Sequence, residues 1–246
     1  TVPEMIIVKQ RSDANSWIVY HASNTAAPET DALVLNTTSA TSDSALYWND
    51  TAPTSSVFTI GTHGQVNGNT ETYIAYCFDS VAGYSKFGSY TGDGTTNGSK
   101  TVNLGFRPAW VMIKCTNDTE SWWIWDNQRN PFTNTQNRVA ADSSGAETTN
   151  VATGADNIQF TSTGFKMTGL GGGSNQNGNT YVYAAFAGGL DSIAPVNTTG
   201  TIDSRVKAST TYGQSIVNYT GNGTAGATVA HGLGAVPEMV IVKRLD

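Results

Sequence analysis

The sequence predicts an all-β protein made of two tandem antiparallel β-sandwich domains, of the jelly-roll or lectin-like kind, related by an internal repeat. Two observations favour this fold class. Short runs of four to six residues rich in Val, Ile, Tyr, Trp and Phe recur along the chain, separated by Asn-Gly, Asp-Gly and Gly-Gly turn signals. The same blocks then return in the same order, which is typical of repeated structural units. A barrel for each unit is the alternative fold.

The repeat is carried by three sequence blocks. A proline-led strand occurs three times: PEMIIVK at 3–9, PAWVMIK at 108–114 and PEMVIVK at 237–243. Two other blocks occur twice: SYTGDGT at 89–95 with NYTGNGT at 218–224, and NGNTETYIAYCF at 67–78 with NGNTYVYAAF at 177–186. The order within one unit is therefore the YTG block, the proline-led strand, a Ser-Trp strand, a variable loop and the NGNT block.

The block order divides the chain into four segments. They are a first lectin-like sandwich at 1–80, a second at 81–188, a linker at 189–208, and the opening segment of a repeat unit at 209–246. Residues 1–80 lack such an opening segment. We expect residues 209–246 to complete the first unit, in the same chain or in a neighbouring one. A window cut from a longer array is the alternative.

The strand runs carry apolar side chains at both alternations. In SWWIWD, at 121–126, side chains on both sides of an extended chain are apolar. This pattern is typical of a central strand that is buried on one face and covered or ligand-facing on the other. Trp17 follows Pro3 by the same 14 positions that separate Trp122 from Pro108. We therefore expect both indole rings to be buried at equivalent places.

Composition and charge exclude two classes of partner. The net charge is −6, and only 13% of residues are charged. No run of Lys or Arg exceeds two residues, whereas nucleic-acid binding needs a basic patch to neutralise phosphates. No apolar run approaches the roughly 20 residues of a membrane span. We expect neither nucleic-acid binding nor membrane insertion.

The chain lacks the residue patterns of common enzymes. Glycoside hydrolysis needs a spaced carboxyl pair, and Glu29-Thr30-Asp31 is the nearest approach to the motif of sandwich glycosidases. No Gly-x-Ser-x-Gly elbow occurs, and the three His form no paired motif. His21 is expected to be solvated at a strand end. We therefore predict no catalytic residue.

No metal or cofactor is expected. Cys77 and Cys115 show no metal-ligand spacing. They are either a pair of small buried side chains or a disulfide, which requires their strands to be adjacent. The loop TGDGTTNG at 91–98 is interpreted as a hairpin turn, because its counterpart at 220–227 has Asn222 in place of Asp93.

Aromatic residues give the only signal for a ligand. Trp and Tyr rings stack on the apolar faces of sugars, while Asp, Asn and Arg bind the hydroxyl groups. Two groups have this composition: Trp123, Trp125, Asp126 and Arg129 in the second unit, and Trp48, Asn49 and Asp50 in the first. We take these seven residues as candidate glycan-binding residues. Core packing of the same rings is the alternative.

The blocks resemble a domain family found in tail-fibre and other virion proteins of marine bacteriophages. The resemblance is carried by GLGAVPEMVIVK at 232–243, SWIVYH at 16–21, LVLNTTSA at 33–40, NDTAPTSSVFTIG at 49–61, YIAYCFDSVAGYSKFGSYTGDG at 73–94 and GFRPAWVMIK at 105–114. It covers nearly the whole chain. The family is similar to concanavalin-type lectin sandwiches and has no established catalytic set. Its members place the 209–246 type of segment before the part that begins here at residue 1.

Together these observations predict a phage virion surface protein, tail-fibre or capsid-associated, with lectin-like modules for attachment to host-surface glycans. Expected partners are a host glycan, other virion proteins and further copies of the chain. The expected location is the virion surface or the extracellular space. One alternative is a structural repeat protein that forms a fibre or lattice and binds no small ligand. A second is a polysaccharide-degrading enzyme.

Overall fold

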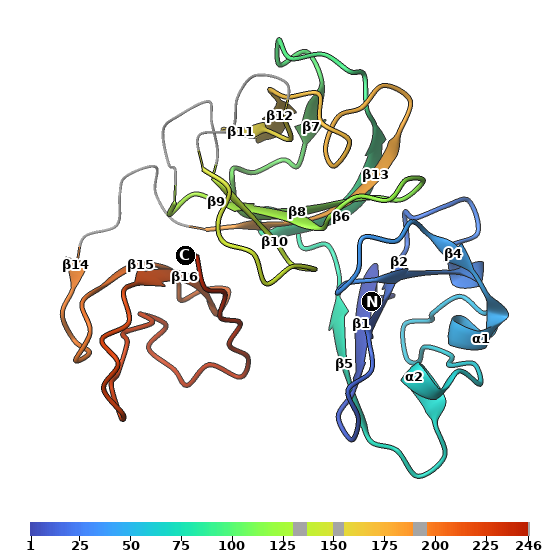
Figure 1. Ribbon diagram of the computed structural model, residues 1–246, viewed down its shortest axis with the longest axis horizontal. Coiled ribbons are helices and arrows are strands. Elements are labelled where there is room, and N and C mark those ends of the chain that lie inside the picture. The colour runs from blue at the N-terminus through green and yellow to red at the C-terminus, as the bar shows by residue number, and fades with distance from the viewer. Residues whose placement is uncertain (130–136, 150–154, 189–195, 246) are drawn as a thin grey trace.

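The computed structural model describes residues 1–129, 137–149, 155–188 and 196–245 (Figure 1). Its named strands all pair antiparallel. The helices are short: η1 (Pro28–Thr30), α1 (Ala45–Trp48) and α2 (Gly64–Asn67). The prediction of an all-β fold with antiparallel sheets is therefore confirmed.

Residues 1–80 form one five-stranded sheet in the order β4-β3-β2-β1-β5. Its strands are β1 (Met5–Gln10), β2 (Trp17–His21), β3 (Asp31–Val34), β4 (Ser42–Asp43) and β5 (Tyr73–Phe78). The two short helices α1 and α2 lie in the connection between β4 and β5. Helix α1 is capped at its start by Ser44, whose side chain accepts a hydrogen bond from the Leu46 N–H, and at its end by Asn49 in the left-handed conformation.

The second unit forms two sheets. The larger has the order β10-β9-β8-β13-β6, with β6 (Ser85–Thr91), β8 (Pro108–Cys115), β9 (Trp123–Asp126), β10 (Arg138–Ala140) and β13 (Thr180–Ala187). The smaller has the order β11-β12-β7, with β7 (Thr101–Asn103), β11 (Ile158–Thr161) and β12 (Gly164–Met167).

Three apolar cores hold these elements in layers. The first core lies between the two sheets of the second unit and includes Val111, Trp125 and Phe165. The second lies between the two five-stranded sheets and includes Met5, Leu33, Met112, Trp122 and Val182. The third lies between the sheet of residues 1–80 and the two helices, with Ile6, Tyr20, Trp48 and Val66. The larger sheet of the second unit is therefore covered on both faces.

This layering explains the apolar side chains at both alternations. Along β8, Val111 and Ile113 enter the core between the two sheets of the second unit, whereas Met112 enters the core shared with residues 1–80. Strands buried on both faces select apolar residues at every position. Residues 1–80 differ from the prediction, because they contribute one sheet with a helical cover and not a two-sheet sandwich of their own.

The two five-stranded sheets use the same pairing register at the positions that the sequence blocks align. Ile6 pairs with Tyr20 and Cys77. Val111, at the aligned position, pairs with Trp125 and Ala185. The second unit has one further strand, β6, on the outer side of β13, whereas β5 ends its sheet among the described residues.

The C-terminal residues form a separate three-stranded sheet, β14-β15-β16, of Val196–Asn197, Ser204–Ser209 and Gln214–Tyr219. It is coloured orange to red in Figure 1, on the opposite side of the view from residues 1–80. Part of the predicted linker at 189–208 is thus strand. Charged and apolar side chains alternate there, and β16 pairs with Arg205, Val206 and Lys207. Residues 189–195 lie outside the described part of the chain.

The described residues show no completion of the first unit by the same chain. Among the described residues of 209–246, β16 pairs with β15, and no strand pairs with β5. The C-terminal module, which we define as residues 196–245, contacts the second unit instead. Its Tyr212 stacks on Tyr84, with ring centroids 4.3 Å apart. The Lys243 ammonium donates hydrogen bonds to the carbonyls of Ser143 and Gly145. Completion by a neighbouring chain stays a prediction.

Candidate functional site

The aromatic cluster predicted in the second unit is divided between the interior and an ion-pair network. Trp125 is fully buried in the core between the two sheets. Trp123 is half-buried, and the Arg138 guanidinium lies 4.1 Å from its ring centroid. Neither indole therefore presents an open face for a sugar. The burial of the two indoles differs from the ligand-facing cluster that we expected, because both sides of β9 are packed against protein.

Asp126 and Arg129 bind one another. The Arg129 Nε lies 2.5 Å from the Asp126 carboxylate, and its Nη1 lies 3.0 Å from Glu147. Its second terminal nitrogen donates to the Ile124 carbonyl. The guanidinium is largely enclosed, and its donors are directed at protein acceptors. We conclude that this network fixes the turn after β9.

The candidate residues of the first unit also have structural roles. Trp48 is 2% exposed, and its indole N–H donates to the Asp31 carbonyl at 3.0 Å. Its ring packs edge-on against Tyr20. Asn49 and Asp50 are exposed and have φ of 53° and 45°, so they make the turn that ends α1. Trp48 is a core residue, and only its two neighbours face solvent.

A buried charged cluster lies at one end of the second unit. Arg138 contacts Asp156 through that residue's carbonyl and, at 3.7 Å, its carboxylate. Burial raises the pKa of Asp156 and of Glu120, while the nearby Arg138 opposes both shifts. A Cβ at Gly173 would lie 2.4 Å from the Trp123 indole nitrogen. The backbone at Gly173 therefore packs closely against Trp123 and Asp156. This close packing favours a structural role for the charged cluster.

An open recess of about 570 Å³ lies where residues 1–80 meet the second unit. We call it the junction recess. It is lined by residues after β2, at the end of β6, after β8 and at the start of β13: Ser23, Asn24, Thr25, Ser89, Tyr90, Thr91, Thr116, Thr180 and Tyr181. Pockets at the contact between structural units are a common place for ligands.

Hydrogen bonds hold the polar wall of the junction recess in place. The Thr41 hydroxyl donates to the Asn24 side-chain oxygen at 2.8 Å. The hydroxyls of Thr116 and Thr180 lie 2.7 Å apart. Ser89, Thr91 and Thr25 are exposed. The recess therefore combines fixed polar groups with hydroxyls open to solvent.

Two tyrosines lie beneath the polar lining: Tyr181 is fully buried and Tyr90 is half-buried. The rings of Tyr90 and Tyr181 are stacked, with centroids 5.0 Å apart. Their hydroxyls donate inward, to the carbonyls of Ser174 and Gly172. Burial raises the pKa of both phenols well above the usual value, so both stay neutral. Because no Asp, Glu, Lys or Arg lines the recess among the described residues, its chemistry suits an uncharged, hydroxyl-rich ligand.

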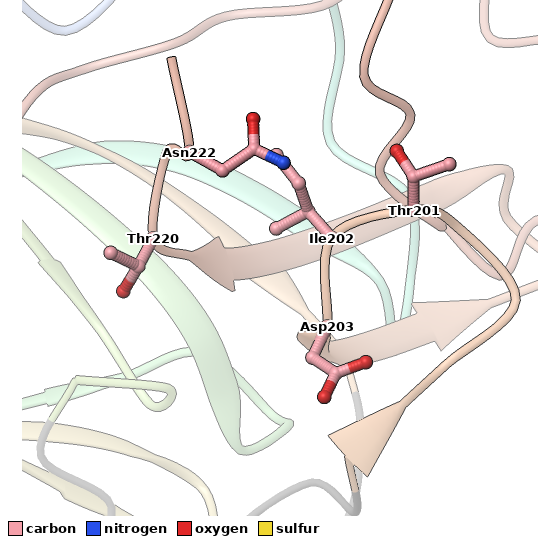
Figure 2. A pocket seen from close by; sticks show the side chains of 5 residues that line it. All are labelled: Thr201, Ile202, Asp203, Thr220 and Asn222. Carbon is pink, nitrogen blue, oxygen red and sulfur yellow. The ribbon is translucent and has the colours of Figure 1, made fainter. Parts of the chain in front are cut away.

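A second recess, of about 470 Å³, lies in the C-terminal module. Figure 2 shows its five labelled side chains: Thr201, Ile202, Asp203, Thr220 and Asn222. The carboxylate of Asp203 and the hydroxyls of the two threonines point in different directions in this view. They do not converge on one position, so this recess is the weaker candidate.

The described residues offer no metal site and no disulfide. Within the described residues, no group of three or more His, Cys, Asp or Glu could hold a metal ion. Cys77 is exposed, Cys115 is buried, and both are free thiols. Across the same residues, no helix is long and apolar enough to cross a membrane. His21, expected to be solvated, is 2% exposed and lies between the two units.

Sequence reasoning missed the junction recess as a site. Its signal was partly visible, since Ser89, Tyr90 and Thr91 lie in the repeated YTG block and Thr180 and Tyr181 in the repeated NGNT block. Those blocks predicted strands. Only the packing of residues 1–80 against β6 and β13 turns their ends into one wall of a recess.

The fold and the recess define a layered, antiparallel all-β protein with an uncharged polar hollow at the contact of its two units. A family model described as a domain of unknown function (DUF7483) matches residues 1–189 and 191–246. The chain therefore belongs to this family. No curated protein and no solved structure matches the chain.

Proposed function

We propose that this protein is a surface module of a phage virion, on a tail fibre or the capsid, that attaches to host-surface glycans through the junction recess. The observation that carries the proposal is the uncharged lining of that recess, with hydroxyl side chains from both units and the Asn24 amide from the first. Neutral sugars are recognised by such polar groups through hydrogen bonds to their hydroxyls. The resemblance of the sequence blocks to virion proteins supports the same class.

The proposed attachment site moves from the indole clusters to the recess. Trp48 and Trp125 are enclosed by protein, and Asp126 and Arg129 bind each other. The junction recess instead offers exposed hydroxyls beside buried, hydrogen-bonded polar groups. A ligand there would contact both units at once, so its affinity would depend on how they pack together.

We also propose that the two five-stranded sheets are copies of one ancestral unit. Support comes from the aligned sequence blocks and from the matching partners of Ile6 and Val111. In this interpretation the two helices of the first unit stand where the second unit has its small sheet. A surface made of related units suits an elongated virion protein, because each unit needs only its neighbours for packing.

The proposal predicts that one charged side chain in the recess weakens glycan binding. Ser89 is exposed and lines the recess. Ser89→Arg places a long cation among neutral groups, so we expect at least about a tenfold loss of affinity, or about 1.4 kcal/mol. Binding to arrayed neutral bacterial and algal oligosaccharides measures the effect, and no sugar release is expected in the same assay.

Ser56→Arg is the matched control, because Ser56 is also exposed but lies in the loop between α1 and α2. It should bind like the unmodified chain. Equal loss in both variants would indicate a general charge effect. If the unmodified chain binds no glycan on the array, the adhesion proposal is wrong.

A further inference from the structure

We infer that the outer edge of β5 is a docking edge for strand β16 of a second copy of this chain. The contact would be antiparallel and would join two sheets into one. This inference does not depend on the glycan proposal. It is built from the free edge of β5, the free edge of β16, and the β13–β6 pair that the chain already contains.

The first step is the chemistry of the β5 edge. β5 is the last strand of its sheet among the described residues. Its sequence, YIAYCF, contains no charge and no proline, and Ile74, Ala75 and Cys77 are exposed. Proteins usually protect such edges with Lys, Pro, a bulge or a covering loop. An exposed, uncharged edge is instead open to addition of a strand from a partner.

The second step is the internal template for that partner. β13, which aligns with β5, pairs on one side with β8 and on the other with β6. β5 has the counterpart of the first partner, β1, but not of the second. The sequence counterpart of β6 is β16, because the YTG block at 90–92 matches the block at 219–221. The strand that would fill the vacant position is thus present in the chain, but at its other end.

The third step is the state of β16. It ends the sheet β14-β15-β16, so one of its edges is also unpaired among the described residues. Its sequence, QSIVNY, carries no charge. Of the fifteen large apolar side chains that are exposed in the described part of the chain, eight lie in the C-terminal module: Val196, Tyr212, Tyr219, Val236, Met239, Val240, Ile241 and Val242. This amount of exposed apolar surface marks the module as an interaction surface.

The contacts of the C-terminal module favour a second copy over the same chain as the donor of β16. The module is fastened to the second unit by the Tyr84–Tyr212 stack and by the bonds from Lys243 to Ser143 and Gly145. In that position β16 pairs only with β15 among the described strands. A second copy can supply β16 without breaking these contacts. Because donor and acceptor edges are different surfaces, the association is head-to-tail and can continue into a chain of molecules.

The template also fixes the register. In the β13–β6 pair, Ala185 faces Lys86 and Tyr181 faces Tyr90. Transferred by the sequence alignment, Cys77 of one copy faces Ser215 of the other, and Tyr73 faces Tyr219. Both residues of each pair lie on the same face of the joined sheet. Cys77 is an exposed free thiol, so the chain carries a natural reporter at this position.

The test is Ser215→Cys in the full chain under mild oxidation. Facing residues of antiparallel strands have Cα atoms about 4.5–5.5 Å apart, within the range of a disulfide. We expect intermolecular disulfides that produce dimers and higher multiples of 25.9 kDa on a non-reducing gel. Peptide mass spectrometry should identify the cross-link between Cys77 and the new thiol at position 215. Cys77→Ser in the same background should remove that cross-link.

Two controls keep the result interpretable. Ile216→Cys moves the thiol by one residue to the opposite face, so its yield should be about tenfold lower. Ala75→Lys, as the only substitution in the chain, places a charge on the acceptor edge, so this variant should be monomeric by light scattering. Ala52→Lys, at an exposed loop position, should associate like the unmodified chain. Circular dichroism checks that all variants keep their β-structure.

Three outcomes would overturn the inference. The first is a chain that stays monomeric and gives no cross-link between Cys77 and the thiol at position 215. The second is a disulfide within one molecule, which would mean that the module completes its own chain. The third is equal cross-linking of Ser215→Cys and Ile216→Cys, which would mean random collision. Glycan binding by a monomeric variant such as Ala75→Lys separates this inference from the adhesion proposal.

Discussion

Replacing Trp122 by alanine is expected to lower the free energy of unfolding by about 3–5 kcal/mol, the usual range for a buried tryptophan. Trp122 is 2% exposed and lies in the core between the two five-stranded sheets, with Met5, Leu33 and Met112. Its indole N–H donates to the Val34 carbonyl at 2.9 Å, from the second unit to the first. The substitution therefore removes packing and a hydrogen bond at one place, and leaves the Val34 carbonyl without that donor.

Urea denaturation followed by circular dichroism measures this effect. Trp17→Ala is the matched control, because Trp17 occupies the aligned position but is only half-buried and packs on Tyr76 at 6.4 Å. We expect it to lose about 1–2 kcal/mol, mainly from the lost aromatic contact and partial burial. A change below about 1 kcal/mol for Trp122→Ala would contradict the assignment of this ring to the core between the units.

The contrast between these two tryptophans shows what the sequence predicts and what it does not. The equal spacing from Pro3 and Pro108 predicted equivalent positions in two strands. It also predicted that both rings are buried, but burial depends on what covers the sheet at that point. Residues of the first unit cover Trp122, whereas Trp17 lies near the open β5 strand. The prediction of burial therefore holds for Trp122 and is wrong for Trp17, which is only half-buried.

Most strand positions were predictable because they follow from short-range patterns. Strands form within the runs at 3–9, 73–78 and 108–114, since β-branched and aromatic residues favour extended chain and the turns between them carry Gly and Asn. The prediction of a third proline-led strand at 237–243 is wrong: this run forms no strand, and its side chains Val240, Ile241 and Val242 are exposed, because no described strand lies beside it to pair with. The face-to-face packing of the two units was not predictable. Alternating apolar residues show that both faces of a strand are covered, but not by which sheet.

The candidate site depended even more on tertiary packing. Trp, Asp and Arg close together in sequence predicted a sugar site, yet the same residues suit a core with an ion pair at its margin. Trp125 is buried and Asp126 binds Arg129, so these residues form a core with an ion pair at its margin. The junction recess joins Asn24 to Thr180 across 156 positions of sequence. No local pattern could have connected these residues.

Acidification is expected to weaken the contact between the two units through His21. This side chain is 2% exposed, and burial lowers its pKa from 6.5 to about 4, opposed by a hydrogen bond to the Tyr183 carbonyl. Its Nδ1 accepts a hydrogen bond from the Ser23 N–H at 3.1 Å, and its Nε2 lies 3.1 Å from the Tyr183 oxygen. The neutral ring with its proton on Nε2 satisfies both partners. A second proton on Nδ1 would oppose the Ser23 N–H.

The sign of the effect follows from linkage. Above pH 6.5 the imidazole is neutral in both folded and unfolded states, so His21 does not lower the free energy of unfolding there. Between pH 6.5 and about 4 the unfolded chain binds a proton that the folded chain excludes. The free energy of unfolding should therefore fall by up to about 1.4 kcal/mol per pH unit, and by about 3 kcal/mol across the window.

The experiment compares the pH dependence of unfolding in the unmodified chain and in His21→Gln. Glutamine keeps a donor for the Tyr183 carbonyl and does not titrate, so its variant should lack the loss assigned to His21 while keeping the slopes of all other groups. Asp156 and Glu120 have raised pKa values and contribute in the opposite direction, but equally in both proteins. Their contribution therefore cancels in the difference. Parallel curves from pH 7 to pH 4 would show that His21 accepts its proton in the folded state, and that the contact between the units has no acid-sensitive group at this position.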